Sequence, residues 1–194
     1  MRPGLEESAE AVRGRATGVL FLSAFGALWL ILGLAARSWL SAWTGVAVAL
    51  GLAVLAGSAL GLSRRARMLP PTSLPPEEQR RIGRVFARVN AVQWVAIFAV
   101  AFILGRLHLD AYIPAAVTLV VGLHFFPLAR AFRNPQHDLT GTVLVLWALG
   151  CLAVASRETL QSTTALGTGA ILWTSAASTL GRAFRALPGD RSTG

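Results

Sequence analysis

Apolar stretches about 20 residues long recur along almost the whole chain of 194 residues, and they limit its possible folds more than any other feature. About 20 apolar residues is the length that an α-helix needs to cross the hydrocarbon core of a bilayer. Only 14% of the residues are charged, against about a quarter in an ordinary soluble domain. The sequence therefore predicts an all-α integral membrane protein, a polytopic bundle of six transmembrane helices.

Short polar or basic segments separate the apolar runs and set the predicted boundaries. Polar tails are expected over residues 1–14 and 185–194. The one long connection, residues 63–83, is basic and contains two proline pairs, which prevent a continuous helix through it. Its second half has apolar residues at helical spacing among arginines, typical of an amphipathic segment at a membrane surface that continues into helix 3. The six predicted helices cover about 15–36, 39–62, 84–104, 114–132, 139–156 and 163–184.

The arginines indicate how the chain is oriented in the membrane. They carry all of the positive charge, because the chain has no lysine, and they lie at the ends of the apolar runs. Arg37, Arg106 and Arg157 follow helices 1, 3 and 5, whereas every other arginine falls on the opposite side of the predicted bundle. The positive-inside rule then places both termini in the cytoplasm. The expected location is the cytoplasmic (inner) membrane of a bacterium.

The largest group of arginines lies in the connection between helices 2 and 3 and at the start of helix 3. Its main predicted role is to set topology, and it would also attract anionic lipid head groups. Nucleic-acid binding is not expected, because no folded basic module accompanies the charge. The residues of this group are Arg64, Arg65, Arg67, Arg80, Arg81, Arg84 and Arg88.

Each pair of predicted helices shares a layout. The first helix of each pair carries a tryptophan and ends at a lone arginine, and helices 4 and 6 both end in an Ala/Gly-Arg-Ala-Phe sequence. Two explanations fit this pattern: an internal repeat of three helical hairpins, as occurs in transporter folds, or the ordinary regularity of an up-and-down bundle.

Three polar residues stand out inside the predicted spans, where polar groups are costly and are functional candidates. Asn90 and Gln93 lie on one face of helix 3, and His124 lies on helix 4. At 1.5 Å per residue, all three lie about 9–14 Å from the cytoplasmic ends of their helices. Pro127 lacks an N–H, so it is expected to kink helix 4 and to free the carbonyl of Leu123 beside His124.

Two interpretations of this candidate polar site remain open. The three side chains and the free carbonyl form a pocket in the cytoplasmic half of the bundle, or His124 and Gln93 hydrogen-bond each other and lock the helix pair. We favour the second, because such bonds are common in membranes and contribute about 0.6–2 kcal/mol.

Helix 2 carries small residues at a strict spacing of four. Ala49, Ala53, Gly57 and Gly61 form a small-xxx-small face that suits close helix packing. The face can pack within the chain or against a second copy in a homo-oligomer. With six helices to pack together, we expect it to be used within the chain.

The sequence predicts no metal, no cofactor and no catalytic residues. The three histidines fall at different depths without a cysteine partner or an i, i+4 pair. No nucleophile, acid and base occur together at one depth, so an intramembrane enzyme is not expected.

The stretch Gly122-Leu-His-Phe-Phe-Pro-Leu-Ala129 resembles a G-x-H-F-x-P-L-A pattern in an uncharacterised family of small bacterial multi-pass membrane proteins. The resemblance implies no activity. The first expectation is therefore a small-solute transporter or channel-like protein with its site between helices 3 and 4, and the alternative is a non-catalytic protein that packs against a partner in the membrane. The first predicts a cavity that reaches His124, and the second a tightly filled interior.

Overall fold

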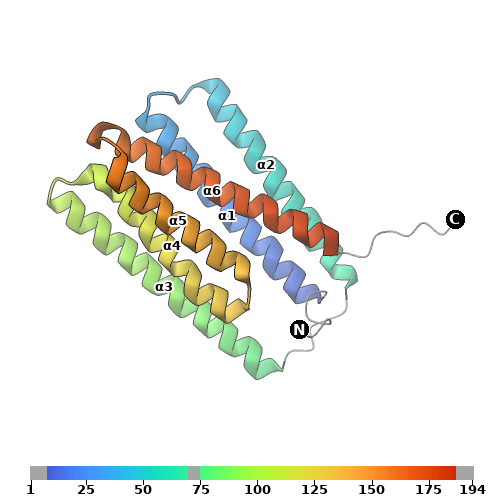
Figure 1. Ribbon diagram of the computed structural model, residues 1–194. Helices are drawn as coiled ribbons and strands as arrows, with labels where there is room; N and C mark the ends of the chain where they lie inside the picture. Colours follow the sequence, from blue (N-terminus) through green and yellow to red (C-terminus); the bar gives the residue numbers. More distant parts are fainter. Residues whose placement is uncertain (1–7, 70–74, 187–194) are drawn as a thin grey trace.

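The computed structural model describes residues 8–69 and 75–186, and over these ranges it confirms an all-α fold of six helices (Figure 1). Parts of both predicted tails and the middle of the basic connection lie outside the described residues. Short 3₁₀ turns η1 (Ala66–Met68) and η2 (Asp110–Tyr112) accompany the helices. The helices are α1 (Ala9–Ala36), α2 (Ala42–Arg65), α3 (Pro76–Arg106), α4 (Ile113–Phe132), α5 (Pro135–Val154) and α6 (Arg157–Ala186).

The first two helices begin where side-chain caps are available, which corrects the predicted starts at residues 15 and 39. The Ser8 hydroxyl accepts a hydrogen bond from the Ala11 N–H at 3.3 Å, so α1 extends into the predicted polar tail. At α2, Ser41 and Thr44 form a reciprocal capping box. Such caps satisfy N–H groups that have no partner inside the helix.

The remaining boundaries follow the same local chemistry. α3 runs without a break from Pro76, so the amphipathic segment is continuous with helix 3, as predicted. The side chain of Asn134 caps α5 by accepting from the Gln136 N–H at 3.1 Å, which moves the predicted start from residue 139 to Pro135. α6 begins at Arg157, six residues before its predicted start.

Five helical segments are long and apolar enough to cross a membrane, judged by length and composition over the described residues. They are Ala9–Ala36, Ala42–Met68, Pro76–Arg106, Asp110–Phe132 and Pro135–Val154. This supports a multi-pass membrane protein. α6 is not one of the five, because serine and threonine dilute its apolar sequence.

The helices pack side by side in the order α2, α1, α6, α5, α4 and α3 (Figure 1). α6 lies at the centre, because it contacts α1, α2, α4 and α5. α2 and α3 lie at opposite edges without a substantial interface between them in the described ranges. Each predicted hairpin pair is in contact, but the largest interfaces join α1 with α6 and α4 with α5. The bundle is therefore not assembled from three separate hairpins.

Glycine pairs create these two large interfaces. Gly26 of α1 faces Gly169 of α6, and a methyl group at Gly169 would lie 2.8 Å from the Gly26 carbonyl oxygen. Gly122 of α4 faces Gly141 of α5, and a methyl group at Gly141 would lie 2.7 Å from the Gly122 carbonyl oxygen. Small residues at the crossing point let helix backbones approach closely, which is the main means of association in a membrane.

Trp173 of α6 contacts two other helices, α1 and α2, near the centre of the bundle. Its indole lies over the glycine gaps at Gly26 of α1 and Gly51 of α2. The indole N–H donates a hydrogen bond to the carbonyl oxygen of Ser23 at 3.0 Å. Trp173 therefore fills the space beside these two glycines.

Candidate functional site

His124 lies on the face of α4 that packs against α3. Its imidazole interacts with the backbone of Val89 on α3. The Nδ1 atom is buried and has no hydrogen-bond partner in the described part of the chain. His124 therefore lies at the contact between α3 and α4.

Asn90 and Gln93 lie on α3 near this contact, and both are half-buried. Neither side chain makes a hydrogen bond to His124 over the residues that the structure describes. The groove that the structure shows elsewhere is lined by none of the three residues. α4 itself continues through Pro127, with the ring on its exposed side, to Phe132.

Aromatic rings surround this contact at one end of the bundle. Phe125 of α4 and His137 of α5 have ring centroids 5.7 Å apart, and Phe132 lies 6.1 Å from His137. His137 is within electrostatic range of His124. The predicted boundaries leave His137 in the connection between helices 4 and 5, apart from His124 on helix 4. The cap at Asn134 puts His137 in the first turns of α5 instead.

Hydroxyl groups form a polar spine along α6, which the sequence analysis missed. These side chains, buried except for the exposed Ser178, bond α6 to its neighbours, so α6 needs little apolar surface. The signal was present as serine and threonine at helical spacing in the last helix. The contacts are Thr118 with Thr168 at 2.9 Å, Thr140 with Ser175 at 2.7 Å, and Gln136 Nε2 with Ser178 Oγ at 2.7 Å and with the Ser175 carbonyl at 3.0 Å.

The small-residue row of α2 faces outward, and the expectation that it packs within the chain is wrong. Ala49, Ala53 and Gly57 are exposed, and Gly61 is half-buried. Side chains added at Gly57 or Gly61 would meet nothing within 4 Å. α2 packs through its opposite side on α1 and α6, because the gap at Gly51 accepts Trp173.

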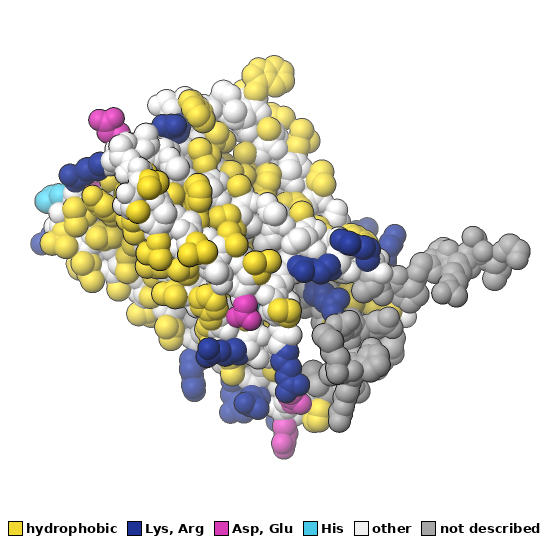
Figure 2. Space-filling view, viewed as in Figure 1, with side chains coloured by type: hydrophobic (Ala, Val, Ile, Leu, Met, Phe, Trp, Pro, Cys, Tyr) yellow, Lys and Arg dark blue, Asp and Glu magenta, His cyan; other side chains and the backbone are white. Residues whose placement is uncertain are grey.

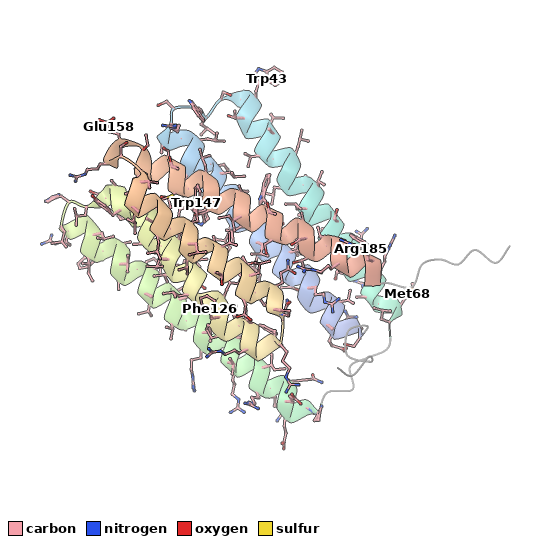
Figure 3. The ribbon with its side chains drawn as sticks, in the orientation of Figure 1. Trp43, Met68, Phe126, Trp147, Glu158 and Arg185 are labelled. Carbon is pink, nitrogen blue, oxygen red and sulfur yellow. The ribbon has the colours of Figure 1, made fainter. Side chains whose placement is uncertain are left out.

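The predicted lipid-facing arginines are all exposed, on the last turn of α2, on η1 and on the first turns of α3. Arg65 also lies over the ring of Phe184, 5.5 Å from its centroid, which links the ends of α2 and α6. Figure 2 shows hydrophobic side chains across the middle of one face, with basic groups toward the ends of the helices. Figure 3 shows Trp43 and Glu158 at one end of the bundle and Met68 and Arg185 at the other.

The described residues contain no group of three or more His, Cys, Asp or Glu side chains that would hold a metal ion. Comparisons of the chain with protein-family models, curated proteins and solved structures give no match. The functional argument therefore depends on the packing and surfaces of the molecule alone.

Proposed function

We propose that the protein is a non-catalytic membrane protein that associates with a second copy of itself through the small-residue row of α2. One observation carries this proposal: the row is exposed and open, while the interior is closed by glycine contacts and Trp173. In lipid, small residues are of most use where another helix approaches closely.

The surface around the row has the shape that such a contact needs. Val46, Leu50 and Val54 are spaced by four residues and are 51%, 62% and 66% exposed. They form a ridge beside the shallow groove that the small residues make. Two copies of α2 can therefore pack the ridge of one into the groove of the other, the usual arrangement of paired helices.

The membrane arrangement is part of the same proposal. The chain crosses the cytoplasmic membrane of a bacterium six times, with both termini in the cytoplasm. α6 makes the sixth crossing although it is weakly apolar, because four helices surround it and its hydroxyls bond to them. The arginine-rich end then faces the cytoplasm and contacts anionic lipid head groups, as the positive-inside rule requires.

The test replaces a residue of the row and measures association. Gly57→Leu fills the groove in open space, so folding is retained while self-association weakens by about tenfold or more, the factor that corresponds to about 1.4 kcal/mol. Energy transfer between donor- and acceptor-labelled copies in dilute vesicles measures this self-association. Gly150→Leu on α5, also in open space, is the matched control. Unchanged energy transfer in Gly57→Leu would overturn the proposal.

A second candidate is a small-solute transporter or channel-like protein with its polar site between α3 and α4. The buried Nδ1 of His124 without a partner favours it, because such an atom can receive a proton or a hydrogen bond from a ligand. Loss of solute flux in proteoliposomes carrying His124→Ala, with thermal stability unchanged, would support this function.

A further inference from the structure

A groove of about 400 Å³ opens on the surface of α6, away from both α2 and His124. Its floor is a helical stripe on α6, formed by Thr163, Leu166, Gly167 and Ala170. Leu166 fits against Gly33 of α1, so the α1 side of the floor is closed. The groove is therefore a shallow channel along the helix with few large side chains in it.

Trp147 of α5 forms the other wall of the groove (Figure 3). Its ring lies against Gly167, and its Nε1–H donates to the carbonyl oxygen of Thr164 at 3.2 Å. A hydrogen bond and a glycine contact thus hold the indole in a defined position. The wall exists before any ligand binds.

A single cation stands at the mouth of the groove. Arg37 follows the last turn of α1 and lies over the ring of Trp39, 5.0 Å from its centroid. No carboxylate pairs with Arg37 in the described part of the chain. The Thr163 hydroxyl lies beyond Arg37 in the same groove and makes no hydrogen bond within the described part of the chain. The groove thus offers one unpaired positive charge, then a hydroxyl, then an apolar floor.

The groove has the depth of one bilayer leaflet. Thr163 and Ala170 lie about 9 Å and about 20 Å along α6 from Arg157, at 1.5 Å per residue. Half of a typical hydrocarbon core is about 15 Å. With α6 crossing the membrane as proposed above, Arg37 lies at the level of the head groups and the small residues at the level of the acyl chains.

We propose that this groove binds one anionic phospholipid, with its phosphate at Arg37, a glycerol ester at Thr163, and an acyl chain along Gly167 and Ala170 beside Trp147. The order of charge, hydroxyl and apolar floor matches the order of groups along such a lipid. The proposal is independent of the α2 contact, because the groove is formed by α1, α5 and α6 only.

The experiment uses the full chain in detergent, incubated with phosphatidylglycerol or with phosphatidylcholine of the same acyl chains, and native mass spectrometry to count bound lipids. We expect the protein to retain one phosphatidylglycerol molecule in preference to phosphatidylcholine. Arg37→Gln should lower its occupancy about fivefold, the factor expected from one arginine near a head group. Ala170→Leu should lower the occupancy of both lipids, because it fills the acyl-chain space.

Two variants serve as matched controls: Arg106→Gln at the same end of the bundle, and Ala177→Leu on the exposed side of α6 outside the groove. Neither should change lipid binding, and added inorganic phosphate should not displace the lipid. Equal losses in Arg37→Gln and Arg106→Gln, or full retention in Ala170→Leu, would overturn the proposal. If Ala170→Leu melts early, Ala170→Val tests the same space with a smaller side chain.

Discussion

At the scale of single residues, His124 has a defined structural task. Its imidazole lies against the backbone of Val89 on α3, and α3 has no fully buried residue along its whole described length. α3 contacts chiefly α4 and η2, together with a ring contact between its Trp94 and Phe25 of α1 at 6.2 Å. A helix with so little burial depends strongly on each polar contact that it makes.

The first prediction concerns this contact. His124→Ala should lower the free energy of unfolding by about 0.6–2 kcal/mol, the usual range for a polar contact between membrane helices. The lower midpoint of thermal unfolding in detergent and faster proteolysis at the start of α3 would show it. Asn90→Ala is the control, since Asn90 makes no hydrogen bond among the residues that the structure describes. Equal effects of the two substitutions would contradict a specific role for His124.

At the scale of helices, glycine decides which pairs can approach closely. The same residue type behaves oppositely at two places on α5. Gly141 meets the backbone of α4, whereas Gly150 faces open space. A methyl group is therefore an obstacle at one position and harmless at the other.

The second prediction follows from this difference. Gly141→Ala should destabilise the protein by about 1–3 kcal/mol, because the added methyl group forces α4 and α5 apart. Gly150→Ala should be neutral or stabilising by up to about 1 kcal/mol, because alanine favours the helix. Thermal unfolding of both variants in the same detergent makes the comparison. A Gly141→Ala variant as stable as the parent chain would show that the two helices are not in close contact.

At the scale of the whole molecule, Trp173 connects the interfaces of α6 with α1 and α2. It fills two glycine gaps and makes a hydrogen bond to a third position. Trp43, by contrast, is 84% exposed at the start of α2. Trp173 therefore has a central packing role, and Trp43 lies at the periphery.

The third prediction compares them. Trp173→Ala should lower the free energy of unfolding by about 3–5 kcal/mol, the range for removing a large aromatic side chain from a packed site. Trp43→Ala should change the unfolding midpoint little. Trp173→Phe should fall between the parent and the alanine variant, because it keeps most of the ring but loses the hydrogen bond. Equal unfolding midpoints for Trp173→Ala and Trp43→Ala would contradict the central packing role of Trp173.

Local features of the fold were predictable from the sequence, and pairings between distant helices were not. Apolar run length gave the six helices, and the spacing of small residues identified the row on α2. The direction that this row faces depends on where Trp173 inserts, and Trp173 is separated from α2 by most of the chain. The sequence placed His124 on helix 4, but its neighbour on α3 is the backbone of Val89, which no side-chain pattern reveals. The hydroxyl contacts of α6 were not predicted, because each joins residues 35 to 50 positions apart.

The pairing of α1 with α6 also determines when the bundle can be completed. The hydrogen bond from Trp173 to Ser23 joins residues 150 positions apart. A ribosome adds about 5–20 residues per second, so this interval corresponds to about 8–30 s. Throughout it, the glycine face of α1 lacks its permanent partner. The nascent chain must therefore be kept from associating with other glycine-rich helices until its last helix is made, and truncation before α6 would leave that face exposed indefinitely.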